Sequence, residues 1–105
     1  NHGPHTDRGG CDRCLGALTL DGDRVVRNPA YYIIAHASKF VRPGSVRIDS
    51  SVLEGLPNVA FRTPEGRTVL VVLNHGSSPR TVTVRAEAGL LPLVLPAGSA
   101  ATCVW

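Results

Sequence analysis

The chain has 105 residues, of which 43% are hydrophobic and 18% are charged, and its formal net charge is +3. This length supports at most one domain with a modest core. No stretch approaches the roughly eighteen apolar residues of a membrane span. No signal peptide pattern is present, so any export signal would lie upstream. The arginines are scattered without interleaved aromatic residues, which argues against nucleic-acid binding and favours a solvated surface.

Residues 1–14, NHGPHTDRGGCDRC, are rich in glycine and polar side chains and show neither helical nor strand periodicity. They predict a loop. The chain begins in this loop without an initiator Met and stops at Trp105, directly after a strand pattern. We therefore expect it to be part of a longer protein.

Two cysteines of this loop, Cys11 and Cys14, are separated by two residues. Their spacing fits a local disulfide, a redox pair, or half of a zinc site that His2 and His5 would complete. A redox pair needs a strand before it and a helix after it, and neither is predicted here. Zinc would have to take all four ligands from one short loop. The spacing favours the disulfide, and the other two alternatives stay open.

A small hairpin and a helix are predicted next. Residues 15–20 and 24–27 are short apolar runs on either side of an Asp-Gly-Asp turn, which is typical of a β-hairpin. Asn28 and Pro29 then have the residue types of a helix N-cap and a first helical position. Apolar residues recur at helical spacing over residues 30–41. Four consecutive apolar or aromatic residues at 31–34 make this helix more apolar than a short surface helix needs.

Residues 56–73, LPNVAFRTPEGRTVLVVL, predict the centre of the fold, because they contain two strand patterns around one tight turn. Residues 63–66, Thr-Pro-Glu-Gly, place Pro and Gly where a type I turn favours them. The arms should pair as an antiparallel hairpin. Residues 69–73 are apolar on both faces, which is typical of a strand covered on both sides.

Further short strands are predicted on either side of this hairpin. Residues 45–48 and 51–53 are extended before it, and residues 80–85, 90–95 and 100–105 have strand patterns after it. Within residues 80–85, Val82 and Val84 alternate with Thr81 and Thr83, which predicts a half-exposed strand. Pro92 lies within one of these patterns and restricts it to an edge or a bulge. About seven short strands separated by turns predict a mainly β chain, an antiparallel β-sandwich.

No reaction can be assigned to the residues present. Glu54, Glu65 and Glu87, like the aspartates, fall in predicted turns or loops, where carboxylates are solvated and keep ordinary pKa values. His36 and His75 lack the neighbours of a catalytic triad and are expected to be structural or exposed. The glycine-rich stretch GGCDRCLG lacks the spacing of a phosphate-binding loop. No cofactor is predicted.

Three stretches nevertheless resemble the C-terminal end of glycoside hydrolase family 30, the glucosylceramidase-like and β-1,6-glucanase-like enzymes. They are the helix ending in SKFVRPG, the VAFRTPEG hairpin with its VVLN strand, and the terminal LPAGSAATCVW. The resemblance covers residues 3–105 in order and spacing.

This resemblance implies a two-part enzyme, in which a (β/α)8 barrel performs the chemistry and a β-sandwich packs on its side. Residues 1–44 would be the end of the barrel, with residues 30–41 as its last helix, and residues 45–105 would be the sandwich. A strand from the far N-terminus normally completes that sandwich. Family members are retaining hydrolases with two glutamates about 5–5.5 Å apart on barrel strands. Both would lie upstream of Asn1, so no catalytic residue is carried over.

The resemblance also concerns the first loop. Residues 1–14 would lie at the face where barrel active sites are built, and His5 falls where related enzymes have a polar residue near the sugar. Cys11 and Cys14 match a paired-cysteine loop of bacterial members, which favours the disulfide and a secreted protein. The partners implied are the upstream barrel and a β-glucan or glycolipid substrate. An alternative function is a stand-alone carbohydrate-binding sandwich, although the chain has few aromatic residues for such a platform.

Overall fold

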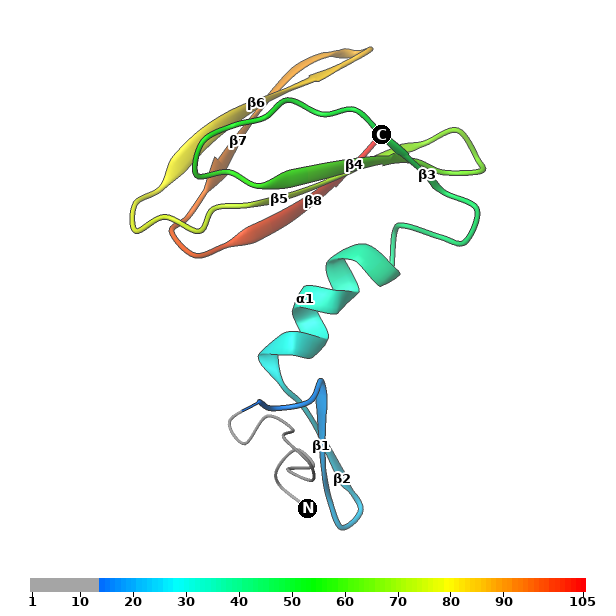
Figure 1. Cartoon of the computed structure of the whole chain (residues 1–105), viewed down its shortest axis with the longest axis vertical. Helices are drawn as coiled ribbons and strands as arrows, with labels where there is room; N and C mark the ends of the chain where they lie inside the picture. The colour runs from blue at the N-terminus through cyan, green and yellow to red at the C-terminus, as the bar shows by residue number, and fades with distance from the viewer. Residues whose placement is uncertain (1–13) are drawn as a thin grey trace, which may run out of the picture. The chain divides into compact units, whose positions relative to one another are not determined.

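The computed structural model describes residues 14–105, and these residues form one helix and eight strands (Figure 1). The elements in chain order are β1 (Leu18–Asp21), β2 (Arg24–Arg27), α1 (Pro29–Ser38), β3 (Val46–Ile48), β4 (Asn58–Arg62), β5 (Thr68–Leu73), β6 (Arg80–Ala86), β7 (Gly89–Leu95) and β8 (Ala100–Val104). The mainly β class predicted from the sequence is confirmed. The chain divides into two compact units between Ala35 and His36.

The first unit contains the predicted hairpin. Strands β1 and β2 pair antiparallel from Leu18 with Arg27 to Asp21 with Arg24. Gly22 occupies the turn with a φ of 57°, a left-handed value that glycine adopts without steric cost. Its strands expose apolar side chains, including those of Leu20 and Val25.

Asn28 joins this hairpin to the helix, although in a different way from the predicted cap. The helix starts at Pro29 as expected. However, the buried Asn28 side chain donates hydrogen bonds to the Gly16 carbonyl at 2.8 Å and to the Thr19 hydroxyl at 2.9 Å. The amide therefore ties the hairpin to the chain entering α1, and the first turn is held by the Asn28 backbone carbonyl, which accepts from the Tyr31 N–H.

Helix α1 ends at Ser38, three residues before the expected end at Val41. The backbone N–H groups of Phe40 and Val41 both donate to the Ala37 carbonyl, so the last turn tightens and the helix stops. Phe40 and Val41 are half-buried. They therefore contribute to packing from a turn rather than from a helical stripe.

The second unit is built on a four-stranded antiparallel sheet with strand order β3-β4-β5-β8. Strand β5 lies between β4 and β8, and its Val69 and Val72 are 0% and 1% exposed. The predicted central strand and its hairpin with β4 are confirmed. In the connecting turn, the Gly66 N–H donates to the Thr63 carbonyl at 2.9 Å, and Gly66 has a φ of 84°.

Strands β6 and β7 form a second, two-stranded antiparallel sheet (Figure 1). Val82 and Val84 of β6 are buried while Thr81 and Thr83 are exposed, as the alternation predicted. Pro92 lies in β7, which has only β6 as a partner in the described chain, so its predicted edge position is confirmed. The core between the two sheets contains Leu56, Val72, Val82 and Leu95.

Asn74, directly after β5, is fully buried and ties three segments together. Its side-chain amide donates to the carbonyls of Ser78, Leu95 and Pro96 at 2.9–3.1 Å. Its side-chain oxygen accepts from the Gly76 N–H at 3.0 Å. All of the hydrogen-bonding capacity of the amide nitrogen is therefore used inside the sandwich, where an unsatisfied polar group would be costly.

Candidate functional site

The three glutamates of the second unit lie on separate turns. Glu54 precedes β4, Glu65 is in the β4–β5 turn and Glu87 is in the β6–β7 turn, and all three are exposed. A retaining glycosidase needs two carboxyl groups on either side of one glycosidic bond, one of them with a raised pKa. Glu54, Glu65 and Glu87 are therefore not assigned as such a pair.

Glu65 has the opposite electrostatic environment from a general acid. The backbone N–H of Glu65 and then the Thr63 hydroxyl donate hydrogen bonds to its carboxylate, and Arg67 and Arg42 add positive charge nearby. These interactions hold the pKa of this carboxyl below its usual value, because they favour the charged form. Glu65 therefore stays ionised at neutral pH.

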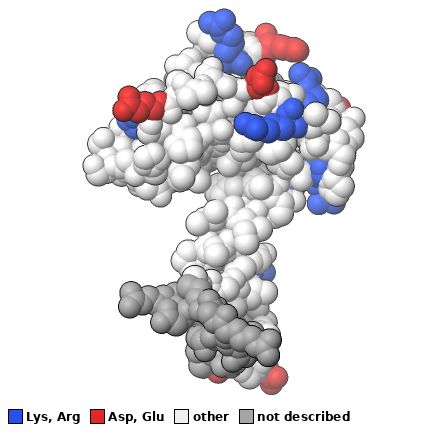
Figure 2. All heavy atoms as spheres, viewed as in Figure 1, with Lys and Arg blue, Asp and Glu red and all other residues white. Residues whose placement is uncertain are grey.

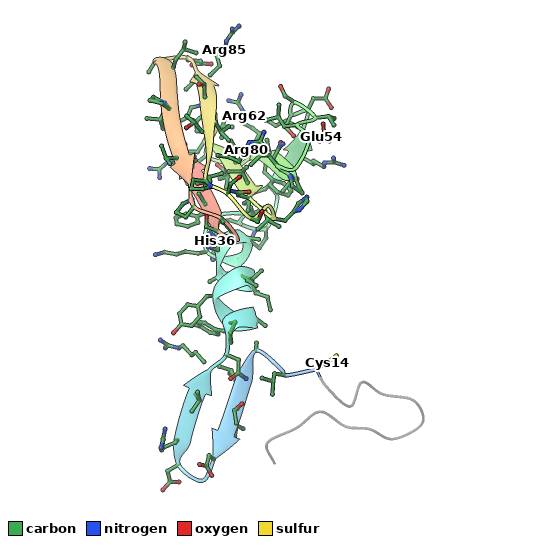
Figure 3. All side chains as sticks on the ribbon, turned by 90° about the vertical axis from the view of Figure 1, so that its left-hand side faces the viewer. Cys14, His36, Glu54, Arg62, Arg80 and Arg85 are labelled. Carbon is green, nitrogen blue, oxygen red and sulfur yellow. The ribbon has the colours of Figure 1, made fainter. Side chains whose placement is uncertain are left out.

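The predicted first-loop residues are only partly within the described chain. His5 and Cys11 lie outside the described residues, as does His2, so the sugar contact, the disulfide and the zinc alternative all remain predictions. Cys14 is exposed at the start of the described chain (Figure 3). Among residues 14–105, no group of three or more metal-ligating side chains is present.

His36 and Cys103 have structural positions. His36 Nδ1 lies 2.8 Å from the Thr102 hydroxyl of β8, and that hydroxyl also lies 3.3 Å from the His36 carbonyl, so the end of the helix is fastened to the sheet (Figure 3). Cys103 pairs in register with Leu70 and is half-buried, and burial raises the pKa of its thiol. A raised pKa makes the reactive thiolate scarce at neutral pH.

One hollow has a volume of about 820 Å³ and opens between the two sheets. Its floor consists of core valines such as Val72 and Val82, and its rim includes Asp49, Arg62 and Trp105. We call it the inter-sheet hollow. It is an open stretch of the sandwich core rather than an enclosed cleft, because the second sheet has only two strands in the described chain.

A smaller hollow of about 350 Å³ lies between the segment after α1 and the β4–β5 turn. We call it the basic hollow. Its lining includes three cationic residues and one carboxylate, together with apolar side chains of the sheet. The charged residues are Lys39, Arg42, Glu65 and Arg67.

The helix itself exposes a large apolar surface. Tyr32, Ile33 and Ile34 are 57%, 67% and 56% exposed, and no residue of α1 is buried. In the face shown in Figure 2, the helix surface is almost entirely free of charged side chains. Exposed apolar surface of this kind is typical of sites that bind another protein, a membrane or a ligand. No helix among the described residues combines the length and the apolar character needed to cross a membrane.

Comparison with known families and sequences gives a consistent result. A family model described as the glycosyl hydrolase family 30 beta sandwich domain matches residues 44–103. The endo-1,6-beta-D-glucanase neg1 of Aspergillus fumigatus is 33% identical over 93 residues, which cover 83% of this chain and 19% of that protein. The lysosomal acid glucosylceramidase of Mus musculus is 35% identical over 91 residues, which cover 84% of this chain and 18% of that protein.

Solved structures show the same similarity. The endo-beta1,6-glucanase BT3312 matches with a TM-score of 0.78 and 31% identity, over 99% of this chain and 24% of that one. SrfJ from Salmonella typhimurium matches with a TM-score of 0.81 and 32% identity, over 94% of this chain and 24% of that one. The chain thus spans about a fifth of the curated relatives and about a quarter of the solved structures that it matches.

Proposed function

Because this chain belongs to glycoside hydrolase family 30 and contains the C-terminal β-sandwich domain of that family, we propose that it is the last part of a retaining β-glycosidase. In this proposal residues 1–44 end a catalytic (β/α)8 barrel, and residues 45–105 form the sandwich that supports it. The two catalytic glutamates lie upstream of Asn1, and the chain contributes no acid or nucleophile to the reaction.

The exposed apolar face of α1 is the observation that supports this proposal most directly. Burying one isoleucine side chain is worth about 1.5–3 kcal/mol. Ile33 and Ile34 leave most of this free energy unused in the described chain, since both are more than half exposed. In this proposal the upstream barrel covers this face, with α1 as its last helix.

The inter-sheet hollow and strand β7 fit the same proposal. Leu90, Leu91 and Val94 of β7 are between 52% and 66% exposed. A strand from the N-terminal part of the parent enzyme would pair with the open edge of β7 and extend the two-stranded sheet. The second sheet of the sandwich would then be wider.

The substrate class is proposed from the relatives alone. Three curated relatives from fungi bear the name endo-1,6-beta-D-glucanase, and others are named glucosylceramidases. We therefore assign the parent enzyme a β-linked glucan or a glucosyl lipid as substrate. His5 would line the cleft for that substrate, from the loop that follows the last barrel strand.

Export of the parent enzyme and a disulfide between Cys11 and Cys14 belong together in this proposal. A disulfide persists only in an oxidising compartment, and two cysteines with this spacing can form one locally. Alkylation of the native protein before and after reduction, followed by mass spectrometry of the peptide containing both residues, tests this. Protection of both thiols before reduction is expected, and alkylation of both in the native protein would contradict the disulfide.

The decisive experiment starts from the coding sequence upstream of Asn1. We expect it to encode alternating strands and helices and two glutamates at the ends of barrel strands. The parent protein should hydrolyse an aryl β-glucoside or a β-1,6-glucan, and replacing either glutamate with Gln should abolish this activity. The 105-residue chain should show no hydrolysis under the same conditions. Enzyme-like hydrolysis by the chain alone would overturn the proposal.

A carbohydrate-binding module remains the second candidate, because Trp105 lies at the rim of the inter-sheet hollow and is 39% exposed. An exposed indole beside polar groups can stack on a sugar ring. Pull-down of the chain with an insoluble β-glucan tests this function. Saturable binding that the Trp105→Ala variant loses would favour it over a purely supporting role.

A further inference from the structure

The basic hollow concentrates positive charge from two separate parts of the sequence. Lys39 and Arg42 belong to the segment that follows α1, and Arg67 directly precedes β5. Phe40, Val69 and Val104 form its apolar walls. Val69 is completely buried, so the walls are fixed by the centre of the sheet rather than by a loose surface.

The single carboxylate of the basic hollow compensates only part of the positive charge of its three cationic residues. Glu65 already accepts hydrogen bonds from its own backbone N–H and from the Thr63 hydroxyl, and it is fully exposed. The three cationic side chains are also exposed, and Lys39 Nζ rests 5.4 Å from the centre of the Phe40 ring. The lining residues therefore have two more positive charges than negative ones.

A free small anion is a poor occupant of this hollow. Arg42, Arg67 and Lys39 are long, exposed side chains, and an ion pair formed by such residues in water contributes little to the free energy of binding. A carboxylate on an already docked polypeptide can still bind there, because its effective concentration at the hollow is high. The guanidinium group of an arginine can also bind a carboxylate through two parallel hydrogen bonds.

We propose that the basic hollow receives acidic side chains from the polypeptide upstream of Asn1 and fixes the sandwich in register on the catalytic barrel. The proposal rests on the proposed function. Lys39 directly follows the helix whose apolar side chains the barrel would cover. A cation at the margin of such an interface needs a partner, since burying an unpaired charge is costly.

The test compares Arg42→Glu in the parent protein and in the 105-residue chain, with Arg47→Glu as the control. Arg47 is an exposed arginine of β3 that lines neither hollow. Thermal unfolding is measured at about 0.01 M and at about 1 M salt, where the Debye length changes from about 30 Å to about 3 Å. In the parent, Arg42→Glu should lower the midpoint by on the order of 2 °C at low salt and by less at high salt.

In the 105-residue chain the same substitution should change the midpoint by less than in the parent, because it removes both the attraction of Arg42 to Glu65 and the repulsion among the three cationic residues. Arg47→Glu should have the same small effect in both proteins. If Arg42→Glu lowers the midpoint equally in the parent and in the chain, or does not lower it in the parent, the proposal is overturned. A midpoint of the chain that rises with millimolar phosphate, and no longer does so in Arg42→Glu, would assign the hollow to a free anion instead. Failure of the proposed function is recognised separately, from an upstream sequence that encodes no barrel.

Discussion

At the scale of single residues, Asn74 is the polar side chain on which the sandwich depends most. It is completely buried, and its amide holds the loop after β5 and the loop between β7 and β8 at once. The sequence places it in a loop, and its residue type suggests a turn. Its partners come from residues up to 22 positions away, so the sequence pattern could not reveal them.

We expect Asn74→Ala to lower the free energy of unfolding by about 3 kcal/mol or more, because it leaves several buried carbonyls without a partner. Urea unfolding of the 105-residue chain measures this. Asn58→Ala is the matched control. The Asn58 amide also donates to two carbonyls, those of Ser51 and Leu56, but near the surface, so its loss should cost about 1 kcal/mol. Equal costs for the two variants would argue against the role assigned to Asn74.

Glu65 gives a prediction about pH. Its pKa in the folded chain lies below the ordinary 4.5, first because of its own backbone N–H and then because of the Thr63 hydroxyl. A carboxyl group with a depressed folded pKa stabilises the fold above its unfolded pKa, and this contribution is lost as the pH falls through the folded value. Titration of the Glu65 carboxyl by NMR should therefore give a pKa below 4.5, and Thr63→Val should move it upward. A pKa at or above the ordinary value would contradict the hydrogen bonds described.

At the scale of elements, local patterns predicted the hairpins and the start of the helix. Asp-Gly and Thr-Pro-Glu-Gly set the turns, because few residues adopt the backbone angles that such turns need. The alternation of Val82 and Val84 with threonines correctly identified the buried face of β6. The end of α1 was predicted too late, because residues 39–41 have helical spacing but pack from a tightened turn.

The β4–β5 turn offers a direct test of this local control. Gly66→Ala should lower the free energy of unfolding by about 1–2 kcal/mol, because Gly66 has a φ of 84° and an L side chain strains that conformation. Open space surrounds the position where a Cβ would lie, so crowding adds nothing. Gly66→Asn should cost less, since asparagine tolerates the left-handed region better than alanine. If Asn costs as much as Ala in urea unfolding, backbone strain is not the cause.

At the scale of the whole molecule, the exposed face of α1 distinguishes a free-standing domain from part of a larger one. The double variant Ile33→Ser and Ile34→Ser should change the stability of the 105-residue chain by less than about 1 kcal/mol, because both side chains are largely exposed there. In the parent enzyme the same change should cost about 3 kcal/mol or more, since two buried isoleucines would be lost. Urea unfolding of both proteins measures the difference. An equally small effect in the parent would mean that no barrel covers this face.

The sequence by itself determined the mainly β class, the turns, the central place of β5 and the similarity to family 30. These features depend on residue spacing and on backbone preferences that act over a few positions. Only the tertiary structure decided where α1 ends and which groups the side-chain amides of Asn28 and Asn74 bind. It also decided that Lys39, Arg42 and Arg67 line one hollow. Those contacts join residues distant in the sequence, and they form only when the sheets pack and every buried polar group must find a partner.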